Sequence, residues 1–366
     1  MLQRLTHTMK TAVVILNWNT REFLRKFLPG LVESCARPDT CVIVADNASG
    51  DGSLEMVSNE FPSVRTIALE ENFGFTGGYN RALAQVDADL FVLINSDVEV
   101  TPGWLEPLEA WMETHPGCGA CAPKLLSYYD HGRFEYAGAA GGLIDSWGYT
   151  FCRGRVMKRV EEDCGQYDEP ADVLWATGAC LMVRSSVWKD MGGLDDRFFA
   201  HMEEIDLCWR MQLRGWKVQV VPQSVVFHLG GGTLPAESPY KLRLNFRNNL
   251  LMLENNLART YILEGSGVHA SLRRSNRRIG ARMLLDGCSA LVYAVTGKWN
   301  YFKAVYHAHE EFRALRRPVT PEMLESFKDS LKGDERVHGR WKGSIILASL
   351  LRKERIFDYI RRRKTS

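Results

Sequence analysis

The sequence predicts an α/β fold built on a central, mostly parallel sheet. Short apolar runs rich in β-branched residues occupy residues 11–16, 41–45, 64–69 and 90–94. Helical patterns and turn residues separate these runs, and such alternation is typical of βαβ units. Three of the four runs end in a cluster of Asn, Asp or Ser. Ligands of open α/β sheets bind at the carboxyl ends of the strands, so we expect a ligand site there.

The segments between the predicted strands favour helices that cover the sheet. Residues 21–36 place apolar side chains on one helical face. Ser53 or Asp51 can cap a second helix, which continues through residues 56–59. A glycine-rich stretch over residues 71–79 then leads into a helix over residues 80–85 and the strand that starts at Leu90.

Polar residues after the first three strand-like segments predict a nucleotide site. Asn17 follows the first strand, and Asp46 follows the second, where its carboxylate can accept hydrogen bonds from a base or a ribose. The stretch that starts at Asn72 and contains Gly74 allows the backbone to approach a ligand closely. Arg81 lies nearby and can bind a phosphate or a base.

The strand over residues 90–94 ends in Asn95, Ser96 and Asp97. An amide oxygen and a carboxylate two positions apart on an extended strand end point the same way, which suits a single cation bound through oxygen. The alternative is a solvated Asn/Asp turn, and this stretch alone does not decide between the two.

The usual phosphate-binding loops are absent from the sequence. It contains no G-x-x-x-x-G-K-[ST] motif, and no G-x-G-x-x-G follows the first strand. These absences weigh against a kinase, an ATPase and a Rossmann dehydrogenase. Cys118 and Cys121 form a lone C-x-x-C without a second pair or a nearby His, so we expect core cysteines in a reducing compartment.

Charge divides the chain into an acidic body and a basic end. Residues 241–366 hold 26 Lys and Arg against 12 Asp and Glu, whereas residues 1–240 hold 20 against 32. The basic end predicts an anionic partner, either a membrane surface or another polyanion, and nucleic acid is not expected. No signal peptide or membrane-spanning run is visible, so we expect a cytoplasmic protein, with peripheral contact at the inner face of the cell membrane as an option.

Four motifs resemble those of the family 2 inverting glycosyltransferases, which have the GT-A fold. They are V-I-L-N-W-N at residues 14–19, D-N-A-S at 46–49, N-F-G-F at 72–75 and N-S-D at 95–97, in the family's order. The resemblance implies that N-S-D is a variant of the D-x-D motif, which holds Mg²⁺ or Mn²⁺ against the donor diphosphate. Asp97 and Asn95 would then be metal ligands. The implied donor-binding residues are Asn17, Asp46, Asn72, Gly74, Arg81, Asn95, Ser96 and Asp97.

The resemblance continues into the middle of the chain. Residues 173–183 form a strand-like run with Gly178 inside it, and residues 203–210, E-E-I-D-L-C-W-R, correspond to an E-D-x-D-L-x-x-R stretch that carries the general base. Glu204 or its neighbour Glu203 would deprotonate the acceptor. Asp206 and Arg210 would pair and orient the site. The implied acceptor-binding residues are Trp175, Gly178 and Asp206. Simple pairing with the helix dipole is the alternative for these acidic groups.

His228 ends the next strand-like run, and its counterpart in relatives completes the metal site. Residues 230–240 resemble the loop that moves over the donor, and Arg247-Asn248 resembles the pair that starts a helical extension. The resemblance covers about residues 10–260. We therefore expect a catalytic domain over residues 1–260 and a basic helical extension over residues 261–366. Residues 341–360 either lie on an anionic membrane or pack on the catalytic domain.

These features predict a metal-dependent inverting glycosyltransferase. The resemblance implies that it would move rhamnose or a similar sugar from a dTDP- or UDP-sugar to a hydroxyl of a glycan or lipid-linked acceptor. One rival is a sugar-1-phosphate nucleotidyltransferase, which needs a glycine-rich basic loop where this chain has residues 17–19. The other rival is a degenerate, non-catalytic module that binds glycans or nucleotide sugars.

Overall fold

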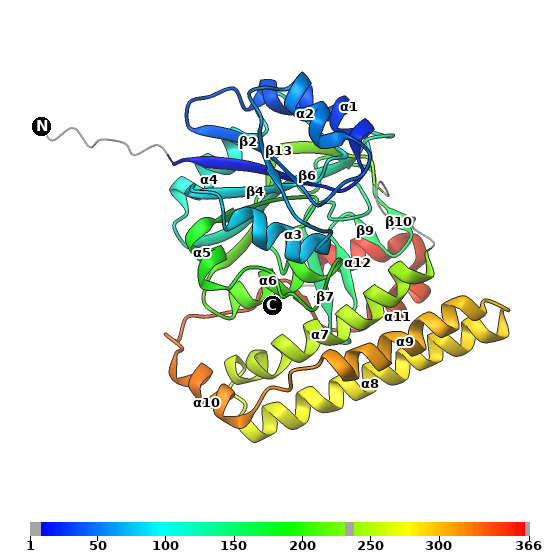
Figure 1. The fold of residues 1–366 in the computed structure, drawn as a ribbon. Helices are drawn as coiled ribbons and strands as arrows, with labels where there is room; N and C mark the ends of the chain where they lie inside the picture. The colour runs from blue at the N-terminus through cyan, green and yellow to red at the C-terminus, as the bar shows by residue number, and fades with distance from the viewer. Residues whose placement is uncertain (1–8, 231–237, 363–366) are drawn as a thin grey trace, which may run out of the picture.

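The computed structural model describes residues 9–230 and 238–362, and its centre is a large mixed sheet (Figure 1). The strand order is β11-β13-β6-β12-β4-β1-β2-β3, with β5 paired to β13. The pairs β3–β2, β2–β1, β1–β4 and β6–β13 are parallel, whereas β12 runs antiparallel between β4 and β6. The strands are β1 (Thr11–Asn17), β2 (Thr40–Asp46), β3 (Arg65–Ala68), β4 (Leu90–Ile94), β5 (Val98–Val100), β6 (Cys118–Ser127), β11 (Ala171–Asp172), β12 (Cys180–Arg184) and β13 (Lys217–His228).

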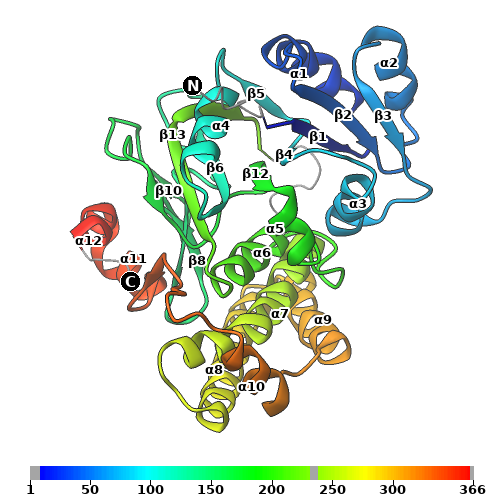
Figure 2. The same cartoon turned by 90° about the vertical axis from the view of Figure 1, so that its left-hand side faces the viewer.

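Helices cover both faces of this sheet and make a three-layer structure (Figure 2). One face packs on α1 (Arg21–Ser34), α2 (Ser53–Glu60) and α4 (Leu105–Thr114). The other face packs on α3 (Gly74–Leu83), α5 (Ser185–Asp190) and α6 (Glu203–Gln212). All five residues of β4 are buried, as expected for a central strand that is covered on both faces.

The C-terminal part adds a layer of long helices beyond α6. These helices are α7 (Pro239–Leu263), α8 (Val268–Val295), α9 (Trp299–Leu315) and α10 (Pro321–Asp329). A smaller sheet has the order β10-β9-β8-β7-β14. Its strands are β7 (Gly142–Asp145), β8 (Thr150–Cys152), β9 (Arg155–Val156), β10 (Arg159–Val160) and β14 (Arg340–Trp341), and α11 (Ile345–Arg352) and α12 (Ile356–Arg362) pack against it. The last part of the chain thus returns to the smaller sheet, where β14 pairs with β7.

The predicted strands over residues 11–16, 41–45, 64–69 and 90–94 are present, but two other expectations need correction and one sheet was not expected. The third helix starts at Gly74 rather than at residue 80, because Asn72 Oδ1 accepts a hydrogen bond from the Gly74 N–H. The run over residues 173–183 is a strand only from Cys180, since a turn at Gly178 and Ala179 precedes it. The small sheet was not predicted, because its strands are two to four residues long.

Candidate active site

The predicted polar cluster forms where the parallel strands β1, β2 and β4 end. Asn17 Nδ2 donates to Asp46 Oδ1 over 2.7 Å, which joins the ends of β1 and β2. Thr20 Oγ1 lies 2.5 Å from Asn17 Oδ1 and 2.8 Å from Ser96 Oγ, and so extends the network to the end of β4. Asn17, Asp46 and Ser96 are buried. Parallel pairing brings these residues together although they lie up to 79 positions apart.

The N-F-G-F segment is fixed beside this cluster by Asn47. Its side chain donates to Asn72 Oδ1 and to the Gly74 carbonyl over 2.9 and 3.0 Å, and it accepts from the Phe73 N–H. Gly74 has φ +68°, and a Cβ there would lie 2.5 Å from the ring of Phe199. Glycine is therefore required at position 74 by both backbone conformation and space.

Asp97 and His228 lie together at the metal-binding position that the sequence predicts. His228 Nε2 is 3.1 Å from Asp97 Oδ1 and 3.5 Å from the side-chain amide of Asn95. His228 Nδ1 is 3.4 Å from Glu135 Oε2. Burial by itself lowers the pKa of His228, but the hydrogen bonds and charges of Asp97 and Glu135 outweigh it and raise that pKa to about 10. The buried acids thus create a site that favours one positive charge.

The side chains at this position could ligate a divalent cation that also binds a diphosphate. Among residues 9–230 and 238–362, no group of three or more His, Cys, Asp and Glu side chains is arranged to hold a metal ion. Mg²⁺ sites commonly use one or two protein ligands, and substrate phosphates and water complete the shell. Asp97 and His228 would supply such a partial set, with the Asn95 oxygen as a third ligand if its amide rotates.

The first turn of α6 carries two carboxylates in an apolar setting. Glu203 is 4% exposed and Glu204 is partly buried, and one buried oxygen of each has no hydrogen-bond partner within the described residues. Burial raises the pKa of Glu203 well above its ordinary value, and the charge of Glu204 adds to this effect. Burial also raises the pKa of Glu204, to about 7, although N–H groups of residues 178, 204 and 205 favour its charged form.

The two carboxylate sites meet at one turn of the chain. The Ala179 carbonyl accepts a hydrogen bond from the Asn95 N–H over 3.0 Å, next to the predicted metal-binding position. The adjacent Gly178 N–H favours the ionised carboxylate of Glu204. A Cβ on Gly178 would come within 3.3 Å of the Phe75 ring. Gly178 therefore lies between the N-S-D segment and Glu204.

The loop that leads into α6 is held in a strained conformation. Phe199, His201 and Met202 all have positive φ angles between 61° and 73°. The side-chain amide of Asn248 donates to the carbonyls of residues 198, 200 and 201 over 2.7–2.9 Å. Arg247 donates to the Phe198 carbonyl over 2.7 Å. Arg247 and Asn248, the predicted pair, thus position the start of α6. The structure places them inside α7 rather than at its start, because that helix begins at Pro239.

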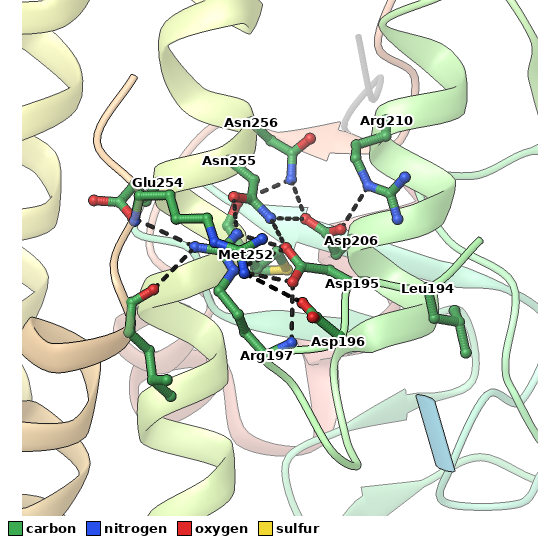
Figure 3. A network of polar contacts seen from close by, with 12 residues as sticks. Leu194, Asp195, Asp196, Arg197, Asp206, Arg210, Met252, Glu254, Asn255 and Asn256 are labelled. Carbon is green, nitrogen blue, oxygen red and sulfur yellow. Dashed lines mark hydrogen bonds and ion pairs between the residues drawn. The ribbon is translucent and has the colours of Figure 1, made fainter. Parts of the chain in front are cut away.

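Asp206 lies in a buried polar network between α6 and α7 (Figure 3). It is fully buried and accepts hydrogen bonds from Arg210 Nε over 2.7 Å and from the amides of Asn255 and Asn256 over 2.9 and 2.8 Å. The predicted pairing with Arg210 is present. These three donors occupy the carboxylate, so the position does not support a direct contact between Asp206 and an acceptor.

Two other predicted site residues are not in contact with the polar cluster. Trp175 is buried in the core, and Arg81 lies on the exposed surface of α3. The Trp175 ring is 4% exposed, and its N–H donates to the Leu143 carbonyl over 3.2 Å. Arg81 is exposed on the last turn of α3, and its guanidinium stacks 3.5 Å from the centre of the Phe73 ring. Acceptor binding by Trp175 and donor binding by Arg81 remain predictions. Most of the predicted lid, residues 231–237, lies outside the described residues.

Sequence reasoning missed two residues of the site, Glu135 and His201. Glu135 contacts His228 from a segment between strands that matches no motif. His201 precedes the acidic pair, and its Nε2 is buried without a partner within the described residues. Burial and the nearby Lys241 charge lower the pKa of His201 to about 4, so this imidazole is neutral at pH 7. An unexplained His beside an acidic pair was the one available signal.

Comparison with known proteins shows the family to which the chain belongs. Residues 12–158 match the family described as "Glycosyl transferase family 2", and residues 90–306 match "Glycosyl transferase family group 2". The chain is 28% identical over 294 residues to N-acetylglucosaminyl-diphospho-decaprenol L-rhamnosyltransferase of Mycobacterium tuberculosis. The aligned region covers 73% of this chain and 95% of the relative. It is 36% identical over 133 residues to the uncharacterized glycosyltransferase YfnE of Bacillus subtilis, over 35% of this chain and 33% of that protein.

A solved structure supports the fold. GalNAc-T7 with UDP, GalNAc and Mn²⁺ superposes with a TM-score of 0.51 at 16% identity, over 68% of this chain and 48% of that chain. This chain therefore spans about half the length of that structure, and the likeness concerns the fold alone. With the family match over more than half of the chain, the conclusion is that the protein belongs to the family 2 glycosyltransferases of GT-A fold and is rhamnosyltransferase-like.

Proposed function

We propose that this glycosyltransferase is metal-dependent and inverting, and that it moves rhamnose or a similar hexose from a dTDP- or UDP-sugar to a lipid-linked glycan. The relative from M. tuberculosis is named for a lipid-diphosphate acceptor and for rhamnose, which supports this choice. The division into a catalytic domain over residues 1–260 and an extension over residues 261–366 is part of the proposal.

One observation carries the proposal: the Gly178–Ala179 turn links two carboxylate sites with different chemistry. On one side Asp97 and His228 would hold a cation. On the other side Glu203 and Glu204 each have an oxygen without a partner among the described residues. A bound Mg²⁺ or Mn²⁺ would neutralise the charge that builds up on the departing nucleoside diphosphate. Asn17, Asp46 and Asn72, close to the carboxyl ends of the parallel strands, would hold the nucleoside, and Gly74 would keep the N-F-G-F segment packed against Phe199.

Glu204 is the better candidate for the general base. Its pKa of about 7 lets it be ionised at neutral pH and still accept a proton from the acceptor hydroxyl. Burial raises the pKa of Glu203 well above its ordinary value, and the charge of Glu204 adds to this effect, so Glu203 is the second candidate. The acceptor oxygen would attack the anomeric carbon on the face opposite the diphosphate, which inverts the configuration.

The decisive test measures release of nucleoside diphosphate from dTDP-rhamnose and a panel of UDP-sugars, with a lipid-diphosphate N-acetylglucosamine acceptor and Mn²⁺, Mg²⁺ or EDTA. We expect turnover of one donor that EDTA abolishes and that Asp97→Ala lowers by about 10²–10³-fold. Asp87→Ala, at an exposed carboxylate, is the matched control. Donor binding without turnover would favour a non-catalytic module, and no donor binding would refute the proposal.

Peripheral membrane contact through residues 261–366 is the last part of the proposal. The structure contains no helix, within the residues it describes, that is long and apolar enough to cross a bilayer. The sequence left two alternatives for residues 341–360, packing on the catalytic domain or lying on an anionic membrane, and α11 has one face that suits each. In α11, Ile345 and Ala348 pack in the core, whereas Leu347, Leu350 and Leu351 are 56–72% exposed.

A further inference from the structure

The outer face of α8 is an unusual surface for a helix at the edge of a protein. Its inner face packs on α7 and α9 through Val268, Ser271, Ser275, Ile279, Arg282, Asp286 and Ala290. The opposite face carries Arg273, Arg277, Leu284, Leu291 and Val295, which follow one another at helical spacing. These five residues, which we call the α8 stripe, all lie on the side away from the packed face.

The two halves of the α8 stripe differ in chemistry. The first half is basic, with Arg273 and Arg277 exposed. The second half is apolar, because Leu284, Leu291 and Val295 are 74%, 63% and 83% exposed. Trp299 follows at the turn into α9 and is 59% exposed. Isolated exposed apolar residues are ordinary, but a row of them along one helix marks an interaction surface.

A pocket of about 440 Å³ opens at the basic half. It is lined by Trp147, Ala270, Arg273, Arg274, Arg277, Arg278 and Ala281. Arg274 pairs with Glu264 at 2.9 Å, and the Arg278 guanidinium lies 4.6 Å from the Trp147 ring. Arg273 and Arg277 form no ion pair with any residue that the structure describes. The pocket thus offers two uncompensated guanidinium groups beside an aromatic side chain, which suits a phosphate group.

We infer that the α8 stripe docks on the surface of an anionic phospholipid bilayer. Leu284, Leu291 and Val295 would enter the headgroup–acyl boundary, and Arg273 and Arg277 would bind lipid phosphates. Interfacial Trp is common at this depth, which suits Trp299. At about 1.5 Å per residue, the helix spans roughly 40 Å and lies along the surface rather than across it.

The positive charge on the outer face of α8 favours an anionic bilayer as its partner over a second copy of this chain. Asp286 is the only acidic residue of α8, and it is buried in an ion pair with Arg282 at 2.8 Å. The outer face of α8 is therefore cationic without any acidic residue. A two-fold symmetric contact would set this face against itself and bring like charges together. An anionic lipid surface complements it instead.

The position of α8 agrees with this role. It lies in the outer helical layer, at the end of the molecule away from α1 and α2 (Figures 1 and 2). Arg282 on its inner face donates to the carbonyl of Gly148 and to Asn249 Oδ1 over 3.3 and 2.6 Å. These hydrogen bonds connect α8 to residues 1–260, the proposed catalytic domain, so α8 would hold that domain against the membrane. The inference deepens the proposed membrane contact and does not depend on the transfer reaction.

The test is co-sedimentation of the full chain with vesicles of phosphatidylcholine alone or with phosphatidylglycerol, at low and high salt. We expect binding to the anionic vesicles that salt weakens. Arg273→Gln with Arg277→Gln should lower the partition coefficient about 25-fold, at roughly fivefold per cation. Leu291→Ser with Val295→Ser should lower it about tenfold. Lys26→Gln with Arg65→Gln, exposed residues near α1 and α2, should leave it unchanged.

Three results would overturn the inference. They are no binding of the unmodified chain to anionic vesicles, binding that neither α8 pair changes, and a concentration-dependent dimer that Leu291→Ser with Val295→Ser abolishes. Both pairs change exposed side chains, and thermal melting checks that the variants fold. Turnover of a soluble acceptor analogue should be the same in all variants. A failure of vesicle binding with normal turnover refutes only the docking surface, whereas absent turnover refutes the proposed function.

Discussion

The first turn of α6 carries acidic side chains on two sides of the helix, and their environments are opposite. Glu203 and Glu204 in the first turn each have a buried oxygen without a partner within the described residues. Asp206, in the same helix, accepts three hydrogen bonds and forms an ion pair with Arg210. A carboxylate whose partners are all supplied by the protein stabilises the fold. A carboxylate with unfilled acceptor capacity and a raised pKa is available to a substrate.

The greatest change that we expect is the loss of activity in Glu204→Gln. The amide keeps the size of the side chain but cannot take a proton, so we expect kcat to fall by about 10³–10⁴-fold. Thermal stability should not decrease, because the substitution removes a buried ionisable group. Glu203→Gln is the matched control and should retain far more activity. Equal losses in both variants would contradict the assignment of the base to Glu204.

Asp206→Ala should lower stability, with donor binding by the folded protein retained. It leaves Arg210, Asn255 and Asn256 without their buried acceptor, and we expect the free energy of unfolding to fall by about 3–5 kcal/mol. The folded fraction should retain donor binding. Chemical denaturation measures the loss, with Asp87→Ala as the exposed control. A change below about 1 kcal/mol would show that the network does not stabilise the packing of α6 on α7.

The dependence of activity on pH tests the charge state of the first turn. Glu204 must be ionised to act as a base, so kcat/KM at saturating metal should rise about eightfold between pH 6 and pH 7.5 for a pKa of about 7. His201, with its pKa near 4, stays neutral over this range. Lys241 lies nearby, and burial lowers its pKa below the usual value. A flat profile from pH 5.5 to 8 would remove Glu204 from the base role.

Glu203→Gln should reveal a smaller effect, on stability. The pKa of Glu203 is raised from 4.5 on folding, so the native state binds more protons than the unfolded chain. The stability that comes from this carboxyl is full below pH 4.5 and is lost as the pH rises toward the folded pKa. At pH 8 the variant should gain about 1–2 kcal/mol and melt about 2–4 °C higher, with little difference at pH 4.5. Melting curves at both pH values decide this, and a lower melting temperature at pH 8 would contradict it.

Much of the sheet and its ligand edge could be predicted, because local patterns encode them. The run over residues 90–94 is apolar throughout and is a fully buried strand. Asn17, Asp46 and Ser96 stand at strand ends, and parallel pairing brings them together. The two-residue strands β9 and β10 leave no comparable pattern, so the small sheet could not be predicted. The environment of Trp175 was equally hidden, since its burial depends on Gly142, 33 positions away.

The sequence by itself determined the order of the motifs, the family and the charge difference between the two halves. Motif order and composition are properties of the chain, and they do not depend on packing. Only the tertiary structure separated Glu204 from Asp206, because the difference lies in the donors that α7 brings to one carboxylate and not to the other. It also showed that Arg273, Leu284 and Val295 share one exposed face, since exposure depends on where α7 and α9 cover α8. Burial and hydrogen-bond supply are set by contacts between segments distant in the sequence, and local patterns do not encode them.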